Sequence, residues 1–238
     1  MTSEKIERLL NDNTASLFRF ANKIWLADGL GALYLPEIHL LVVSDLHFGK
    51  GSFLKQHGHP LPTYDTIATI ELIEKLLERY QPITVLCLGD SFHDVRVGER
   101  LSNAEAMAIR AMIEQVQQWI WVLGNHDPDI PAGFAGEQVS IWEYEDIVFT
   151  HEPLTDTGLA NYQIMGHFHP KLTHSIKRQQ MTGKCFIASM HELIMPSLGV
   201  YTGGLSVDDP VYEEVFTTSA NQTVLCYQEK AFLLLLNK

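Results

Sequence analysis

Three apolar runs in the first half of the chain each lead directly into a short polar motif. Residues 39–44, 83–88 and 119–123 precede Asp45-x-His47, Gly89-Asp90 and Gly124-Asn125-His126-Asp127, respectively. Short continuous apolar runs are typical of strands that are buried on both faces of a sheet. Ligands of open α/β sheets collect at the carboxyl ends of the strands, so we expect these polar side chains to meet at one point.

Helical and strand patterns alternate in the first half of the chain, and strand patterns dominate after it. Apolar side chains recur at helical spacing in residues 63–80, and Ser102 with Glu105 has capping-box spacing at the start of a second helix, 102–118. Short β-type runs follow at 139–144, 147–150, 185–189, 212–218 and 223–227. This order favours an α/β fold in which sheets pack together with helices outside. No repeat or linker divides the chain, so we expect a single domain over residues 1–238.

Two further motifs add three imidazoles to the carboxylates. His151 follows the run 147–150, and Gly166-His167-Phe168-His169 follows the run 163–165. In an extended segment residues separated by one point to the same side, so His167 and His169 can reach one site together. With His47 and His151 the motifs supply four imidazoles, together with two carboxylates and one amide oxygen. That mixed nitrogen and oxygen set suits Mn, Fe, Zn or Co better than Ca, which prefers oxygen ligands.

The charge of the chain limits which partners it can bind. Lys and Arg number 17 and Asp and Glu number 29, so the formal net charge is −12. Such a balance argues against binding nucleic acid over the whole surface. Residues 50–55 and 171–184 contain basic side chains and no acid; the second run holds Lys171, Lys177, Arg178 and Lys184. These runs either contact backbone phosphates or are solvated surface residues.

Neither a membrane span nor a disulfide framework is expected. The apolar stretch 231–236 is far shorter than the roughly 20 residues that cross a bilayer, and the N-terminus has no long apolar signal core. The three cysteines are Cys87, Cys185 and Cys226. Their odd number and wide spacing suit reduced thiols and a cytoplasmic location.

The ordered series Asp-x-His, Gly-Asp, Gly-Asn-His-Asp, His and Gly-His-x-His, between about Leu41 and His169, resembles the calcineurin-like metallophosphoesterase superfamily. The resemblance implies a metallophosphoesterase-type sandwich of two mixed β-sheets flanked by helices. It also implies two divalent metal ions; Mn is the first candidate for their identity, and Fe, Zn, Co and Ni are alternatives. One ion would bind Asp45, His47 and His169, the other would bind Asn125, His151 and His167, and Asp90 would bridge both. His126 would contact the phosphate and protonate the leaving oxygen.

The flanks of these motifs carry a narrower resemblance. Ser44-Asp-Leu-His-Phe-Gly-Lys50, Cys185-Phe186 and the segment PSLGVYTGGL at 196–205 are similar to the ligase-associated bacterial metallophosphoesterases, usually named as DNA damage response endonucleases. This resemblance implies single-stranded DNA as a candidate substrate and a DNA ligase or helicase as a candidate partner. The link to DNA comes from the name of that group and not from a residue of this chain.

One position departs from the superfamily pattern. Many relatives carry Asp three residues after the bridging Asp, where it orients the catalytic His, whereas this chain has His93 followed by Asp94. Asp94 and Asp127 are therefore the candidates for orienting His126. Asp127 is equally compatible with a role as a buried structural carboxylate.

Glycines at 203 and 204 predict a tight turn over Tyr201-Thr-Gly-Gly204. The alternative is that backbone amides of this segment approach a phosphate. The histidines His57 and His59 are expected in an exposed loop.

These features predict a phosphoester hydrolase in which a hydroxide between two metal ions attacks phosphorus directly, with no covalent enzyme intermediate. Two divalent ions, two carboxylates and a hydroxide leave the site a charge of about +1, so an acidic protein can attract a phosphate there. The leading hypothesis is a phosphodiesterase or endonuclease acting on DNA in repair. The net charge of −12 favours the alternative, a small-molecule phosphoesterase acting on nucleotides, cyclic nucleotides or a sugar-lipid pyrophosphate. A third hypothesis, a partner-binding subunit of a ligase or helicase system, is disfavoured because all seven metal positions carry ligand residues.

Overall fold

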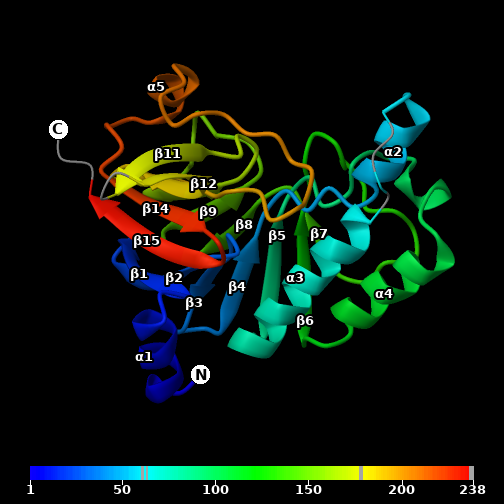
Figure 1. Ribbon diagram of the computed structural model, residues 1–238, viewed down its shortest axis with the longest axis horizontal. Helices are drawn as coiled ribbons and strands as arrows, with labels where there is room; N and C mark the ends of the chain where they lie inside the picture. Colours follow the sequence, from blue (N-terminus) through cyan, green and yellow to red (C-terminus); the bar gives the residue numbers. More distant parts are fainter. Residues whose placement is uncertain (60–61, 63, 177–178, 236–238) are drawn as a thin grey trace.

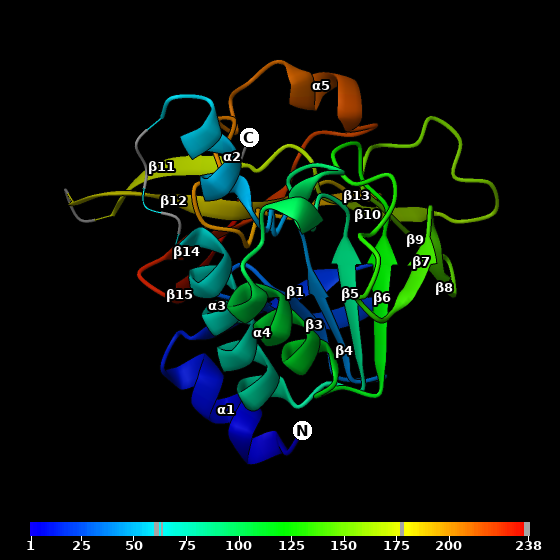
Figure 2. The ribbon, with the colours of Figure 1, turned by 90° about the vertical axis from the view of Figure 1, so that its right-hand side faces the viewer.

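Two mixed β-sheets pack face to face, and helices cover the outer side of the first sheet (Figure 1, Figure 2). This computed structural model describes residues 1–59, 62, 64–176 and 179–235. The expected α/β sandwich of two mixed sheets flanked by helices is confirmed. The helices are α1 Ser3–Asn11, α2 Lys50–Gln56, α3 Asp65–Tyr80, the 3-10 turn η1 Val97–Glu99, α4 Asn103–Ile113 and α5 Val211–Val215.

The first sheet has the strand order β1-β2-β3-β4-β5-β6-β7. Strands β1 to β4 are antiparallel neighbours, and β4 to β7 are parallel. The parallel half places the carboxyl ends of β4, β5 and β6 at one edge. The bounds are β1 Ala15–Phe20, β2 Lys23–Asp28, β3 Leu33–Leu35, β4 Leu40–Val43, β5 Thr84–Leu88, β6 Gln118–Val122 and β7 Glu137–Val139.

The second sheet has the order β15-β14-β12-β13-β10-β9-β8, and β11 pairs with β12. Strands β9, β10 and β13 are parallel neighbours, and the other pairs are antiparallel. The bounds are β8 Trp142–Tyr144, β9 Ile147–Thr150, β10 Tyr162–Met165, β11 Lys171–Ile176, β12 Gln179–Ala188, β13 Glu192–Ile194, β14 Gln222–Tyr227 and β15 Lys230–Leu235.

The central strands of the first sheet are apolar on both faces because both faces are covered. Along β4, Leu41 and Val43 pack into the core on the helix side, whereas Leu40 and Val42 pack into the core between the sheets. Successive side chains of a strand point to opposite faces, so both sets are fully buried. This double burial explains the continuous apolar runs that precede the polar motifs.

Several expected elements differ from the structure. The run 139–144 is split, since β7 belongs to the first sheet and β8 to the second. Residues 212–218 were expected as a strand, but Val211–Val215 form helix α5, whose buried Tyr212 packs over the second sheet. Helix α4 starts at the expected capping box of Ser102 and Glu105 but ends at Ile113 rather than near residue 118, because residue 118 already begins β6.

Two simpler expectations concern the membrane and the thiols. In the described part of the chain, no helix has both the length and the apolar character that crossing a bilayer requires. Cys87, Cys185 and Cys226 are free thiols, as expected, and all three are also buried.

Candidate metal centre

The predicted ligands lie where parallel strands of both sheets end. Asp45, Asp90 and Asn125 follow β4, β5 and β6 of the first sheet, while His151 and the pair His167 and His169 follow β9 and β10 of the second. Hydrogen bonds and ion pairs connect these residues across the two sheets. The sandwich therefore brings five separate motifs to one place, and each sheet supplies part of the ligand set.

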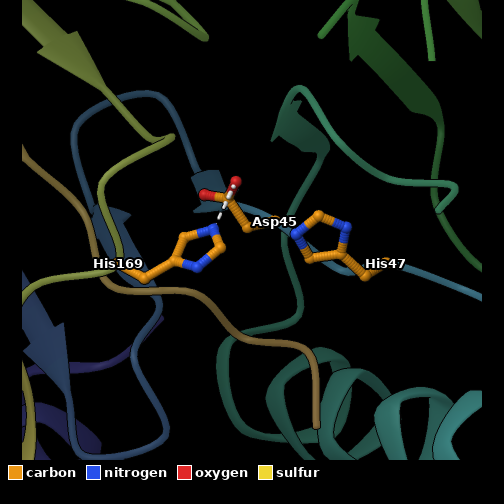
Figure 3. A group of neighbouring side chains, drawn as sticks. All are labelled: Asp45, His47 and His169. Atoms are coloured by element: carbon orange, nitrogen blue, oxygen red, sulfur yellow. Dashed lines mark ion pairs between the residues drawn. The ribbon is translucent and has the colours of Figure 1, made fainter. Parts of the chain in front are cut away.

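The first group consists of Asp45, His47 and His169 (Figure 3). One potential ligand atom from each residue lies within 4.8 Å of those of the others, and Asp45 Oδ1 is 2.9 Å from His169 Nε2. Both ring nitrogens of His47 are buried, and within the described residues they make no hydrogen bond. Buried polar atoms in proteins nearly always have partners, so an unpartnered imidazole aimed at a carboxylate fits a metal ligand.

The second group surrounds His151. Its Nε2 lies 3.0 Å from Asn125 Oδ1, 3.3 Å from Asp90 Oδ1 and 3.3 Å from His167 Nδ1. On the other side of the ring, Nδ1 is 2.9 Å from the carbonyl oxygen of Leu88. That carbonyl accepts the Nδ1 proton and leaves Nε2 directed at the group, the arrangement usual for a metal-binding histidine.

Asp90 lies between the two groups. One of its carboxylate oxygens is 3.3 Å from His151 Nε2 and the other is 4.0 Å from His47 Nε2. Asp45, Asp90 and His151 also form a compact candidate ligand set by themselves. The two acids thus link both groups, and the donor set fits a pair of divalent ions.

The charges of the cluster are strongly coupled. Burial by itself would raise the pKa of Asp45, but His169, His151 and His47 hold it below its ordinary value. Burial lowers the pKa of His47 to about 3, so this ring is neutral and able to donate a lone pair. For His151 burial acts in the same direction, but Asp90 and Asp45 outweigh it and raise its pKa to about 9. A proton on His151 therefore compensates the two carboxylates in the metal-free protein.

Most of the predicted ligands have a left-handed backbone. Positive φ angles of 47–70° occur at Asp45, His47, Asp90, His167 and His169. Each such residue costs roughly 1–3 kcal/mol and persists only where the surroundings hold it. Here the amides of Asp45 and His47 donate to the carbonyl oxygens of Gly89 and Asp90, which extends the β4–β5 pairing beyond the strands.

Two motif glycines allow the segments to approach one another. Gly89 has φ +69°, and a Cβ there would lie 2.4 Å from the His151 ring. A Cβ at Gly166 would lie 2.0 Å from Ser44 Oγ and 2.7 Å from Asp45 Oδ2. Real Cβ atoms do not approach other atoms so closely, so both positions need glycine for the two sheets to meet here.

The structure answers which group orients His126. The ring Nδ1 lies 3.0 Å from the backbone carbonyl oxygen of His93, and the two rings stack with centroids 5.3 Å apart. Neither acid considered from the sequence takes this role in the described part of the chain. Asp94 pairs with Arg100, while fully buried Asp127 accepts the backbone amides of Asp90, Phe92 and Gly124. These contacts favour the second of the two roles considered for Asp127 from the sequence, that of a buried structural carboxylate.

Sequence reasoning missed the residues that hold Asp45 in place. Ser44 Oγ donates to Asp45 Oδ2 at 2.5 Å, and the His167 amide donates to the same oxygen at 3.1 Å. Ser197 Oγ and the Gly199 amide donate to the backbone carbonyl of Asp45 at 2.8 and 3.1 Å. The segment 196–205 drew notice in the sequence only through its resemblance to a subgroup, because nothing local reveals a contact across 152 residues.

The basic runs are only partly described. Lys177 and Arg178 lie outside the described residues. Lys50 begins α2, and the nearby Asp45, Asp90 and Asp65 counteract the burial that lowers its pKa. Lys171 and Lys184 line a cavity that also reaches His169. Part of each predicted basic run therefore lies beside the candidate metal centre.

Comparisons with known proteins agree with this architecture. The solved structure of the Pseudomonas putida nuclease MPE is 20% identical, with a TM-score of 0.70, and the match covers 92% of this chain and 100% of that one. The Escherichia coli phosphoesterase Yfce is 13% identical, with a TM-score of 0.40, over 83% and 99% of the two chains. At these identities the first match shows a shared fold. No curated protein sequence matches the chain.

The comparison with protein-family models supports a stronger conclusion than the structural matches, because the matched range includes the motifs themselves. A model of the calcineurin-like phosphoesterase domain matches residues 38–184, which is more than half of the chain. All seven predicted ligands and His126 lie inside this range. The chain belongs to the calcineurin-like phosphoesterase family and is a metal-dependent phosphoesterase.

Proposed function

We propose that the protein is a phosphodiesterase that cleaves DNA with two divalent metal ions, with Mn as the first candidate. The observation that carries the proposal is the convergence of seven nitrogen and oxygen ligands from both sheets, including the unpartnered buried ring of His47. The DNA substrate is supported by the solved structure with the same fold along nearly the whole chain, which is named a nuclease. A role in DNA repair in the cytoplasm belongs to the same proposal, and the buried free thiols agree with a reducing compartment.

The ligands divide between two ions as their contacts suggest. Asp45, His47 and His169 would hold one ion. Asn125, His151 and His167 would hold the other, and Asp90 would contact both. When bound, the ions would neutralise phosphate charge and lower the pKa of a water to near neutrality, which supplies the nucleophile.

His126 is suited to protonate the leaving oxygen. Its Nδ1–H donates to the carbonyl oxygen of His93, so Nε2 is the atom that can transfer a proton. Its backbone amide donates to Asp90 Oδ1 at 2.9 Å, which ties the histidine to the central ligand. Asn125 and His126 are both exposed, so this side of the centre is accessible to a polymeric substrate.

A first experiment separates the substrate classes. The Mn-loaded protein is assayed with a bis-aryl phosphodiester, an aryl phosphomonoester and fluorescent single-stranded DNA. Mn-dependent DNA cleavage that is abolished by Asp90→Ala, but retained by the matched control Asp129→Ala, supports the proposal. Asp129 is an exposed acid on the loop after β6, which also carries Asn125 and His126. Activity on small esters with none on DNA refutes the nuclease assignment.

A small-molecule phosphoesterase is the second candidate, favoured by the formal net charge of −12. DNA cleavage should weaken steeply with salt, because basic residues that contact phosphates release counterions. Neutralising Lys177 and Arg178 together should lower DNA cleavage without changing bis-aryl ester hydrolysis. An unchanged rate on DNA at all salt concentrations would instead favour a small substrate. A DNA ligase or helicase partner can be tested by adding it to the same assay.

Direct attack by water is tested by isotope transfer. A single-turnover reaction in ¹⁸O-labelled water should place one labelled oxygen in the phosphate product. Phosphate without label would contradict attack of water on phosphorus. A phosphoenzyme hydrolysed by water would also take up one label, so the configuration at a chiral phosphorothioate diester is measured as well. Inversion supports a single direct displacement, and retention would indicate a covalent enzyme intermediate and contradict the mechanism.

A further inference from the structure

A second polar cavity adjoins the metal centre at His169. It has a volume of about 260 Å³ and is lined by His169, Lys171, Lys184, Ser197 and the turn 199–203. Pockets for whole drug-sized ligands span roughly 300–1,000 Å³, so this cavity suits a smaller group. Because His169 lines it and also contacts Asp45, a group bound there would lie next to the candidate metal centre.

Two lysines provide the cationic lining. Lys171 and Lys184 stand opposite each other on β11 and β12. Lys184 Nζ donates to the Ser197 carbonyl at 3.0 Å, and Lys171 Nζ donates to the Thr202 carbonyl at 3.5 Å. An ammonium group has three donors, so each lysine keeps two for a ligand. Across residues 1–59, 62, 64–176 and 179–235, neither lysine forms an ion pair with a carboxylate.

The surrounding backbone holds Lys171 in position. Its amide donates to the Leu205 carbonyl, its carbonyl accepts from the Val207 amide, and it pairs with Lys184 on the other side. A Cβ at Gly204 would lie 2.8 Å from Lys171 Cε, so the turn packs directly on the lysine stem. Burial lowers the pKa of Lys184, while Cys226 and Asp28 act in the opposite direction and Lys171 adds a smaller lowering effect; a bound anion would offset the cost of burying this charge.

The same turn connects the cavity to the metal centre. Ser197, whose carbonyl accepts from Lys184, donates its hydroxyl to the Asp45 carbonyl. Tyr201 lines the cavity with a left-handed φ of 60°, a conformation that a bulky side chain adopts rarely. Residues 197–203 thus form a wall shared by the cavity and the Asp45 loop. The tight turn expected over Tyr201-Thr-Gly-Gly204 is displaced: the turn lies at residues 200–201, and neither Gly203 nor Gly204 has a positive φ.

We propose that this cavity is a second phosphate subsite, in which Lys171 and Lys184 bind the phosphate next to the scissile one along a polynucleotide. The inference rests on the proposed phosphodiesterase function and narrows its substrate to chains with at least two phosphates. It explains how an acidic protein can select a polyanion: the positive charge is concentrated beside the metal centre.

The test compares substrates that differ only in a neighbouring phosphate. Scission of the internal diester is measured for TpT, pTpT and TpTp with the Mn-loaded protein, and bis(4-nitrophenyl) phosphate serves as the substrate without a second phosphate. Charged hydrogen bonds of this kind account for about tenfold or more in affinity, so we expect one of pTpT and TpTp to exceed TpT by about tenfold or more in kcat/KM. The gain should appear mainly in KM.

Variants assign the effect to the cavity. Lys171→Met should remove the preference, measured as the ratio of kcat/KM for the better of pTpT and TpTp to kcat/KM for TpT, whereas Lys171→Arg should keep most of it. Lys75→Met, at an exposed position paired with Glu229, controls for the change in net charge. Lys184→Gln is the second variant and should also lower the preference.

Each outcome is decisive. A wild-type protein that hydrolyses the diesters with no preference for a second phosphate overturns the subsite and leaves the phosphodiesterase intact. A preference that survives both Lys171→Met and Lys184→Gln in folded protein also overturns the subsite. A wild-type protein that hydrolyses none of the diesters, the bis-aryl ester included, refutes the proposed function and the subsite with it.

Discussion

The replacement Asp127→Asn tests whether this acid supports the structure or takes part in the reaction. Asp127 Oδ1 accepts the amides of Asp90 and Gly124 at 2.9 and 3.0 Å, and Oδ2 accepts the amide of Phe92 at 3.0 Å. An asparagine has the same shape but replaces one oxygen with an NH₂ group, which cannot accept. In either orientation of the amide, at least one buried backbone N–H loses its partner.

The number of lost hydrogen bonds sets the expected loss of stability. One unsatisfied buried donor costs about 1–3 kcal/mol, and each kcal/mol lowers Tm by about 2–4 °C in a protein of this size. The Tm of Asp127→Asn should therefore fall by about 2–12 °C. Because Asp127 holds the turn that carries Asp90, the Mn concentration needed for half-maximal activity should rise as well. Thermal melts followed by circular dichroism and Mn titrations of the initial rate measure both effects.

A catalytic role would give the opposite pattern. General acid–base catalysis contributes about 10²–10⁴-fold, so loss of an orienting carboxylate would lower kcat by a large factor. An unchanged Tm and Mn dependence together with such a loss in kcat would refute the structural assignment of Asp127. Asp129→Asn, at an exposed position two residues away, is the matched control and should change neither property.

Three further changes have defined outcomes. His126→Ala should lower kcat on a phosphodiester by roughly 10²–10⁴-fold at unchanged Mn affinity, and equal kcat values would exclude it as the acid. Asp28→Ala should lower the free energy of unfolding, measured in urea, by about 3–5 kcal/mol. Fully buried Asp28 accepts a hydrogen bond from Arg79 at 2.5 Å, so its removal leaves the guanidinium charge uncompensated. A loss of about 0.5 kcal/mol or less, as for an ordinary surface substitution, would contradict this. In the metal-free protein, contacts with Asp90 and Asp45 outweigh burial and raise the pKa of His151 from 6.5 to about 9. The stability that its protonation contributes is therefore fully present below about pH 6.5 and is lost as the pH rises through about 9. Melts of chelator-treated protein across this range should show the loss, and His151→Asn should abolish the dependence.

The ligand motifs could be read from the sequence because each depends on a local pattern. A doubly buried strand must be apolar throughout, so the residue where the run stops marks the sheet edge, as at Asp45 and Asp90. Helix α4 was recognised at Ser102 for the same reason, since a capping box is a local arrangement. The resemblance of the ordered motifs to a phosphoesterase family then supplied the division of ligands between two ions.

Elements without a local pattern were missed. Strand β1, at the edge of the first sheet, has no long apolar run, because its buried side chains alternate with Ser16, exposed Leu17 and exposed Arg19. Residues 212–218 have strand-like composition, yet Tyr212 packs onto the outer side of the second sheet from a short helix. Tertiary packing decided these conformations against local propensity.

By itself the sequence determined which residue types stand at the strand ends, and hence that a mixed nitrogen and oxygen metal centre was to be expected. Only the tertiary structure decided how they are supported. The carbonyl of His93 orients His126, Asp127 holds three backbone amides, and Ser197 secures Asp45 from the far end of the chain. Such contacts involve backbone atoms, which every residue possesses, or partners far apart in the chain. No residue pattern encodes them, and they exist only once the two sheets have packed together.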